Sequence, residues 1–261
     1  GYIQFLDQNG YAKHYEAPRS ILLLNKRKYK YIAAQDLQVG DTFEDMLGQI
    51  VTVKEITAVK REPEVALCSL AGIVVSNIHS EEEYEDAMYY ALLMIDKCIH
   101  KSDYVLPHVG FTAKNRMSAG VGIMDLAHYM ARKNLFYSSP EGKKEIDRVA
   151  ERHSYYAIKA SLRLGRELGN APWMHRTKWP EGWLPIDTYN RNVDEIVPFE
   201  LRYDWEDLRR QIIANKGIRN SFLVAYMPGE SSSKASGTCN SLYPIRSLTL
   251  MKTDNDITTY W

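Results

Sequence analysis

Cysteine is scarce in this sequence, and its placement excludes two classes of small protein. The 261 residues include three cysteines, Cys68, Cys98 and Cys239, which are far apart and form no CxxC pair. Neither a zinc site nor a disulfide framework has such spacing, so we predict no metal ligands. Reduced thiols are typical of a cytoplasmic protein, and this is the localisation we expect.

Excess charge and long apolar runs are also missing. Lysine plus arginine and aspartate plus glutamate number 33 each, so the formal net charge is zero. Nucleic-acid-binding proteins usually carry a broad basic surface, which this balance does not support. The sequence has neither an apolar run of about 18 residues, which a membrane helix needs, nor a signal-peptide pattern. We therefore expect no nucleic-acid or membrane partner, and the chain is long enough to bury a substantial core.

Residues 1–62 indicate a small β-rich module. Short apolar runs at 21–24, 29–33, 42–43 and 50–53 favour strands, and Asn9-Gly10 is a hairpin signal. Residues 36–41 (DLQVGD) resemble a segment of the β-modules of self-splicing proteins. Such a module needs a Cys or Ser nucleophile at its start and an Asn at its exit, and neither is evident. An inserted or appended module is the favoured interpretation, with a splicing element as the alternative.

Composition changes at Glu62-Pro63, so we predict two domains, 1–62 and 63–261. The second alternates apolar runs with helical periodicity, which is typical of an α/β fold. We expect a buried strand within 64–78, bent at Gly72, and a helix from the capping box of Ser80 and Glu83 to His100. Further helices are predicted at 120–133, 140–168 and 204–216, the last stopped by Gly217, with an irregular stretch at 170–189.

Residues 217–233 (GIRNSFLVAYMPGESSS) carry the strongest chemical pattern. The run 218–227 predicts a strand buried on both faces. Pro228-Gly229 then ends the strand, and serines follow at a possible helix start, where backbone N–H groups and hydroxyls can hold a phosphate. From the residues alone, a plain cap or loop is the favoured interpretation, because serine clusters mostly have that role, and the carboxylate of Glu230 opposes an anion.

Several segments resemble, in one order, the class I ribonucleotide reductase large subunit. Residues 64–70 (EVALCSL) match its E-I-A-L-C-T-L segment. The similarity continues through residues 114–116 (KNR), 120–123 (GVGI), 184–189 (LPIDTY), 203–206 (YDWE), 218–221 (IRNS) and 227–232 (MPGESS). It covers about residues 64–261, and the form is similar to reductases of large bacteriophages.

The resemblance implies part of a ten-stranded α/β barrel that reduces ribonucleoside diphosphates by a thiyl-radical mechanism for deoxyribonucleotide synthesis. It implies that Cys68 is one of the two cysteines that deliver electrons to the substrate. It also implies a loop for the substrate diphosphate made by Pro228, Gly229, Glu230, Ser231 and Ser232. The two serines would supply hydroxyl donors; Glu230 matches a family glutamate without an assigned role, and Cys239 is expected to be structural.

Other motifs of the family are absent from this sequence. We find no N-L-C-x-E motif for the radical cysteine, no partner for Cys68, no Tyr-Tyr pair after the phosphate loop, no C-terminal cysteine pair and no nucleotide-effector region. Residues 1–62 occupy the interval where the radical cysteine would precede Cys68. Both chain ends fall in strand-like segments, so we expect a central-to-C-terminal piece of a longer protein.

The segment itself is therefore expected to bind no cofactor. The resemblance implies that a small subunit supplies the radical cofactor and that a thioredoxin or glutaredoxin type of protein supplies electrons. It also implies the remaining large-subunit segments as partners and a large-subunit dimer. The alternative interpretation is a non-catalytic nucleotide-binding or scaffold fragment of the same enzyme.

Overall fold

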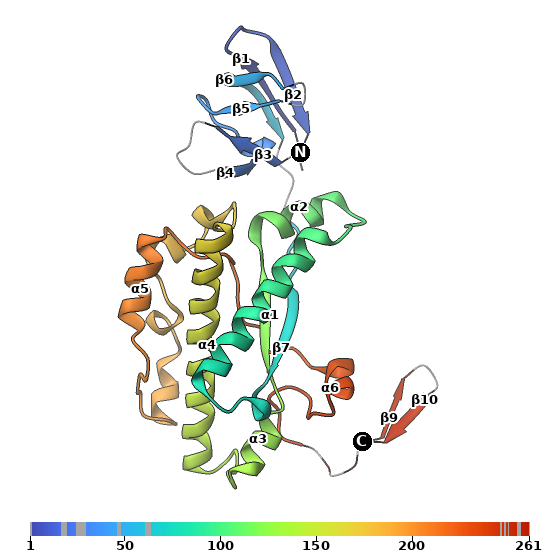
Figure 1. Cartoon of the computed structure of the whole chain (residues 1–261), viewed down its shortest axis with the longest axis vertical. Coiled ribbons are helices and arrows are strands. Elements are labelled where there is room, and N and C mark those ends of the chain that lie inside the picture. The colour runs from blue at the N-terminus through green and yellow to red at the C-terminus, as the bar shows by residue number, and fades with distance from the viewer. Residues whose placement is uncertain are drawn as a thin grey trace.

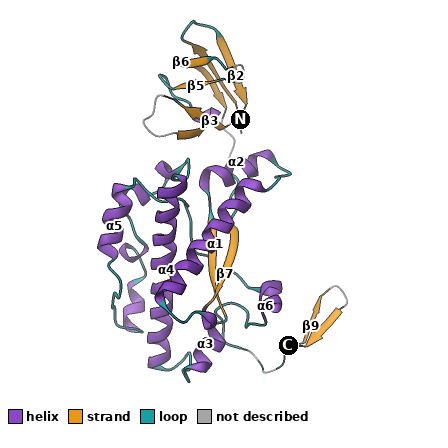
Figure 2. Ribbon diagram, in the orientation of Figure 1, coloured by secondary structure: helices purple, strands orange, loops and turns teal. Residues whose placement is uncertain are grey.

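The computed structural model describes residues 2–16, 20–24, 30–45, 48–60, 64–245, 247, 249, 251–254 and 257–260 (Figure 1). Three groups of strands lie along the chain: a six-stranded sheet near the N-terminus, a parallel pair among the helices, and a hairpin near the C-terminus (Figure 2). No helix among the described residues is long and apolar enough to cross a lipid bilayer.

The N-terminal sheet has the strand order β2-β1-β6-β5-β3-β4. Its strands are β1 (Tyr2–Asp7), β2 (Ala12–Glu16), β3 (Ser20–Leu23), β4 (Lys30–Ala33), β5 (Thr42–Glu44) and β6 (Ile50–Lys60), and the short helix η1 (Ala34–Asp36) joins β4 to β5. The predicted hairpin at Asn9-Gly10 is confirmed, because β1 and β2 pair antiparallel across it. Ile3, Phe5 and Phe43 belong to a core that this sheet buries separately.

Asp36, at the end of η1, contacts the helical part of the chain. The Trp173 indole N–H donates to Asp36 Oδ2 at 3.1 Å, and Arg176 Nη2 donates to Asp36 Oδ1 at 2.7 Å. The predicted boundary at Glu62-Pro63 lies outside the described residues, and the division into domains 1–62 and 63–261 stays a prediction.

Two parallel strands and two long helices form the main core. β7 (Ser69–Val74) pairs with β8 (Ala119–Met124) from Ser69↔Ala119 to Val74↔Met124. Between them lie η2 (Val75–Asn77), α1 (Glu81–Lys101) and α2 (Pro107–Arg116), and after them come α3 (Leu126–Arg132) and α4 (Pro140–Leu168). Ile73, Val121 and Ile123 point into the core with α1 and α4. Parallel strands joined by helices confirm the α/β class.

The predicted start of α1 is confirmed. Ser80 Oγ accepts the Glu83 N–H at 3.1 Å, while the Glu83 carboxylate accepts the His79 N–H at 2.7 Å. The helix predicted at 140–168 is also confirmed, since α4 begins at Pro140 after the Ser139 cap and ends before Gly169. Pro at N1 and Gly after the last turn are the signals responsible.

Other predictions for the second domain were wrong. Residues 119–124 form strand β8, and the helix predicted at 120–133 is only α3, because the positive φ of Asp125 (65°) separates the two elements. No helix was predicted between His100 and residue 120, but α2 lies there, with Pro107 in its first turn. The strand predicted within 64–78 is β7, which includes Gly72 and ends at Val74, and it is only partly buried because Ile73 alone of its six residues is buried.

The C-terminal third is mostly short turns around the core. It contains η3 (Met174–Arg176), η4 (Trp179–Glu181), η5 (Pro185–Asp187), η6 (Arg191–Glu195), α5 (Trp205–Ala214), α6 (Glu230–Ser236), β9 (Met251–Asp254) and β10 (Ile257–Tyr260). The N-cap predicted for Asp204 is confirmed, because its carboxylate accepts the Asp207 N–H at 2.8 Å. The helix ends at Ala214, two residues earlier than predicted. Lys216 and Gly217, which follow its C-cap, both have a positive φ.

Candidate functional site

The candidate site lies where the segment after Arg219 runs beside β8. The Ala119 N–H donates to Phe222 O at 3.1 Å, the Val121 N–H to Leu223 O at 2.9 Å, and the Ala225 N–H to Val121 O at 3.3 Å. The segment runs parallel to β8, but the strand predicted at 218–227 is reduced to one isolated bridge, between Val224 and Val121. The prediction that it is buried on both faces was wrong, because Phe222 is 65% exposed and Tyr226 is 46% exposed. Only Val224 forms a bridge to β8, so this is a short edge contact.

Glycines on β8 bring Cys68 and Met227 over one face of the sheet. A Cβ at Gly120 would lie 2.9 Å from Cys68 Sγ and 2.8 Å from Ala225 Cβ. A Cβ at Gly122 would lie 2.5 Å from Met227 Sδ and 2.8 Å from Ala225 O. Gly120 and Gly122 are two residues apart on a strand, about 7 Å along it. The thiol and the turn after Met227 therefore share the face opposite the α1 and α4 core.

Cys68 comes directly before β7. The residue is exposed, its thiol lies 3.9 Å from Ser69 O, and it forms no disulfide. Partial burial of the thiol group raises its pKa. Cys68 is therefore a protonated thiol at neutral pH, and it can lose a proton and an electron when it forms a disulfide with a second thiol. Cys98 and Cys239 are also free thiols.

The predicted phosphate loop is a tight turn into α6. Pro228 is exposed and Gly229 is buried, with its N–H donated to Asn240 Oδ1. Glu230 has a φ of 24°, which residues with a side chain seldom adopt. The hydroxyl groups of Ser231 and Ser232 are exposed and make no hydrogen bond with any residue that the structure describes. The first N–H groups of a helix have no acceptor within it, so donors of residues 230–232 are grouped at this turn.

Asp125 is a site residue that the sequence did not reveal. It is 1% exposed, and its Oδ1 accepts the Cys239 N–H at 2.6 Å. Its Oδ2 accepts from the Ser76 hydroxyl and lies 3.1 Å from His128 Nδ1. The carboxylate thus fixes the end of β8 to the chain that follows α6. Assigning 120–133 to one helix hid this role, although a lone Asp after an apolar run is a usual sign of a strand end in α/β proteins.

A buried polar network holds the segment that enters the site. Arg219 Nε donates to Asp96 Oδ2 at 2.5 Å, Asn220 Nδ2 donates to Met117 O at 2.8 Å, and Ser221 O accepts the Trp179 indole N–H at 3.0 Å. All three residues of the segment are at most 6% exposed. The IRNS pattern is therefore structural: it fixes the start of the strand that leads to the loop.

A buried histidine supports β8 from the core side. His153 Nε2 lies 2.9 Å from Val121 O, and Nδ1 lies 2.7 Å from the Tyr84 hydroxyl. Burial lowers the pKa of His153 to about 4, so the ring is neutral at pH 7. Its Nε2–H then donates to Val121 and its Nδ1 accepts from Tyr84. Among the described residues, no cluster of three or more His, Cys, Asp or Glu side chains has the arrangement of a metal site.

Comparison with known proteins identifies the family. A family profile described as "Ribonucleotide reductase, barrel domain" matches residues 53–259. The chain belongs to this ribonucleotide reductase family. The match begins inside β6, which is earlier than the similarity seen in the sequence.

Curated relatives of the reductase family agree. The chain is 34% identical over 193 residues to the ribonucleoside-diphosphate reductase subunit alpha of Haemophilus influenzae, 74% of this chain and 25% of that protein. It is 38% identical over 154 residues to ribonucleoside-diphosphate reductase 1 subunit alpha of Escherichia coli, 59% and 20% of the two chains. It is 33% identical over 187 residues to subunit alpha of Enterobacteria phage T4, 71% and 24% of the two chains. The chain thus spans about a quarter of the length of these relatives.

Proposed function

We propose that this chain is part of the large subunit of a ribonucleoside-diphosphate reductase. In this proposal Cys68 is one of the two redox cysteines, and residues 228–232 bind the diphosphate of the substrate. The supporting observation is that Cys68 and the turn after Met227 lie over the same face of β8. A substrate held by its phosphates at one end of this face would place its ribose nearer the thiol.

The thiol's role follows from electron balance. Oxidation of Cys68 and a second cysteine to a disulfide releases two electrons and two protons, while the 2′-hydroxyl of the substrate leaves as water. The second cysteine, the radical cysteine and the remaining strands of a ten-stranded barrel come from other large-subunit segments. A small subunit supplies the radical, and a thioredoxin or glutaredoxin type of protein restores the thiols. The proposed setting is the cytoplasm, with a dimer of large subunits.

The phosphate role rests on the donors at the turn. Ser231 and Ser232 present exposed hydroxyl groups beside the N–H groups that open α6. Hydrogen bonds to a phosphate are charge-assisted and favour such a cluster of donors. Because the Gly229 N–H is donated to Asn240, the N–H groups of residues 231 and 232 are the backbone donors in this proposal.

Reconstitution tests the function. The chain is combined with the complementary large-subunit segments and the small subunit, and CDP reduction is followed. Cys68→Ser should abolish turnover, whereas Cys98→Ser, which changes an exposed thiol on α1, should retain it. Full turnover with Cys68→Ser would remove the redox role and favour a scaffold fragment.

A second variant tests the loop independently. The double variant Ser231→Ala and Ser232→Ala should raise the KM for CDP by about tenfold or more, because each charge-assisted hydrogen bond contributes about 1.5–3 kcal/mol. Ser236→Ala is the matched control, because the Ser236 hydroxyl donates to Ser232 O within the same helix. An unchanged KM in the double variant would contradict the assignment.

A further inference from the structure

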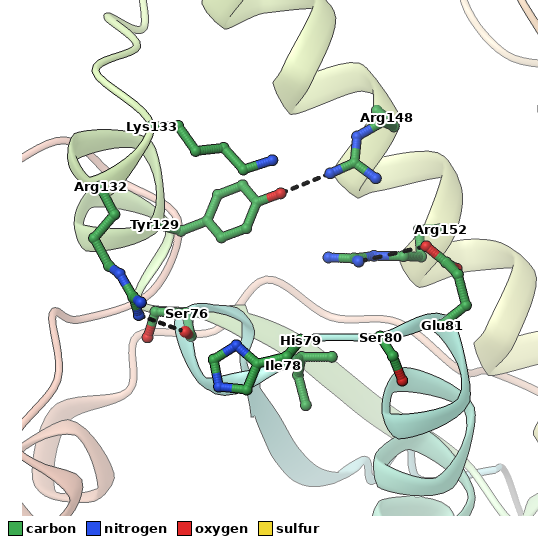
Figure 3. Close-up of a pocket in the computed structure, with 10 residues that line it drawn as sticks. All are labelled: Ser76, Ile78, His79, Ser80, Glu81, Tyr129, Arg132, Lys133, Arg148 and Arg152. Atoms are coloured by element: carbon green, nitrogen blue, oxygen red, sulfur yellow. Dashed lines mark hydrogen bonds and ion pairs between the residues drawn. The ribbon is translucent and has the colours of Figure 1, made fainter.

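A basic cavity lies on the helix side of the sheet, away from Cys68 and the turn after Met227. Its volume is about 470 Å³ (Figure 3). The end of η2, the first residues of α1, the α3 region and α4 enclose it. The lining residues are Ser76, Ile78, His79, Ser80, Glu81, Tyr129, Arg132, Lys133, Arg148 and Arg152. None of them belongs to the candidate site described above.

Cations from two directions face this cavity. Figure 3 shows Arg148 and Arg152 extending from α4 toward Tyr129 and Lys133, which come from the α3 region. Four of the lining side chains are cationic, and Glu81 is the one lining carboxylate. Glu145 stands behind the lining and pairs with both Lys133 and Arg148. Glu83, which accepts the His79 N–H, and Asp125, which accepts from Ser76, also stand behind the lining. The positive charge is therefore concentrated on the lining itself, where four cations face one carboxylate.

Glu145 is firmly ionised. Burial alone would raise its pKa, but hydrogen bonds from Arg148, Lys133 and Tyr129 outweigh burial and lower the pKa to about 2. The Glu145 carboxylate therefore pairs with Lys133 and Arg148, and it forms no ion pair with Arg132 or Arg152 among the described residues. Arg132 donates to Ser76 O at 3.1 Å and forms no ion pair with a carboxylate in the described part of the chain.

Arg152 is the residue that marks the cavity as a built site. It is 5% exposed, and its Nε and Nη2 are buried without a hydrogen-bond partner among the described residues. Its guanidinium lies 4.3 Å from the centre of the Tyr84 ring, and Nη1 lies 3.6 Å from Glu81 Oε1. Unpartnered donors on a buried charged group are costly, and such groups are usually satisfied by a protein atom or a ligand.

We propose that this cavity binds a small molecule that carries a pyrophosphate-like group. Guanidinium groups match phosphate oxygens in geometry and charge, and a lysine adds a further point charge. Four cationic side chains and one carboxylate on the lining suit an anion with more than one negative charge, which a single carboxylate does not provide. The volume falls within the usual range of small-molecule pockets, about 300–1,000 Å³, and leaves room beyond the phosphates.

Arginine footprinting of the full chain tests the site, with inorganic pyrophosphate as the probe. Arg132 is exposed and lines the cavity, so phenylglyoxal should modify it, and peptide mass spectrometry locates the product. Millimolar pyrophosphate at constant ionic strength should slow modification of Arg132 about fivefold or more, as expected when a charged ligand covers the group. Arg163, which is on α4 but outside the cavity and paired with Glu167, should be unaffected. Equal modification of Arg132 with and without pyrophosphate, or equal protection by chloride, would overturn the proposal.

Variants separate this cavity from the loop proposed for the substrate. Arg132→Gln removes the footprinted side chain, so its pyrophosphate binding is measured by isothermal titration calorimetry. It should be about tenfold weaker than in the unsubstituted chain, the effect of losing one charge-assisted hydrogen bond. Arg163→Gln should leave it unchanged. Protection of Arg132 should persist in the double variant Ser231→Ala and Ser232→Ala, and loss of protection there would refute a separate site. CDP that protects Arg132 at lower concentration than pyrophosphate would identify a nucleotide; equal protection would show that the phosphates alone are bound.

Discussion

Breaking the ion pair between Asp96 and Arg219 should strongly destabilise the α/β part, because it leaves one buried charge without its partner. The two side chains are 3% and 8% exposed and lie 2.5 Å apart, and Arg219 also donates to Gly169 O at 3.0 Å. Asp96→Ala leaves the guanidinium buried without its counter-charge. Breaking a buried pair in this way typically costs about 3–5 kcal/mol, a large share of the about 5–15 kcal/mol that stabilises a domain.

Urea unfolding followed by tryptophan fluorescence measures this loss. Four of the five tryptophans, at 173, 179, 183 and 205, lie among the helices and turns of the α/β part, so the signal reports the relevant core. We expect the midpoint to fall with an unchanged m value, because the surface exposed on unfolding is the same. Asp207→Asn, which breaks the exposed pair with Arg210, is the control and should hardly move the midpoint.

A compensating variant decides whether charge is the cause. Asp96→Leu combined with Arg219→Met removes both charges while retaining apolar volume, and such replacements are often neutral or stabilising. The double variant should be more stable than Asp96→Ala. The reasoning is refuted if Asp96→Ala costs less than about 1 kcal/mol, well below the range for a buried pair, or if the double variant is less stable than the single one.

Three further predictions concern pH, packing and thiol chemistry. The pKa of His153 falls from 6.5 to about 4 on folding, so stability should decrease by about 3 kcal/mol as pH drops from 6.5 through 4. In the His153→Gln variant the urea midpoint should depend much less on pH in that window, and an unchanged pH dependence would contradict the assignment. The stability contributed by ionised Glu145 is lost at lower pH, between 4.5 and about 2. Gly122→Ala should cost about 1–3 kcal/mol in thermal or urea unfolding, because its methyl group meets the backbone oxygen of Ala225; an unchanged midpoint would show that the loop backbone can move. The rate of Cys68 alkylation by iodoacetamide should increase with pH, and the pKa obtained from this dependence should lie above that of an ordinary thiol. A pKa at or below the ordinary value would refute the inferred burial.

Elements with strong end signals were predictable from the sequence. Ser80 with Glu83, Ser139-Pro140 and Asp204 each placed a helix start, because a side-chain oxygen accepts an N–H that the helix leaves free. The hairpin at Asn9-Gly10 was predictable for a similar local reason. These signals act within a few residues, so they do not depend on what packs against the element.

β8 was not predictable from local pattern. Val121 and Ile123 alternate with Gly120 and Gly122, but Ile123 also continues the spacing of the helix that follows, so the pattern favoured one helix. The glycines were decisive for a non-local reason: Met227 and Ala225 lie so close to β8 that no side chain fits there. The strand conformation is thus favoured by contact with a segment about a hundred residues away, and this contact cannot be inferred from the neighbouring residues in the sequence.

Cys68 and residues 228–232 were found in the sequence through the family resemblance, and Asp125 shows why the rest, including the basic cavity, was not. Its Oδ1 accepts the N–H of Cys239, which follows the proposed phosphate loop, and its Oδ2 accepts from Ser76, which lines the cavity. One buried carboxylate therefore joins segments that are far apart in the chain, and either segment can move only if it breaks a charge-assisted hydrogen bond. Residues 76, 125 and 239 show no common sequence motif, because they meet only in the folded chain, at the end of β8. The proposed phosphate loop and the basic cavity are thus linked by the hydrogen bonds of Asp125, which is not itself proposed to bind either ligand.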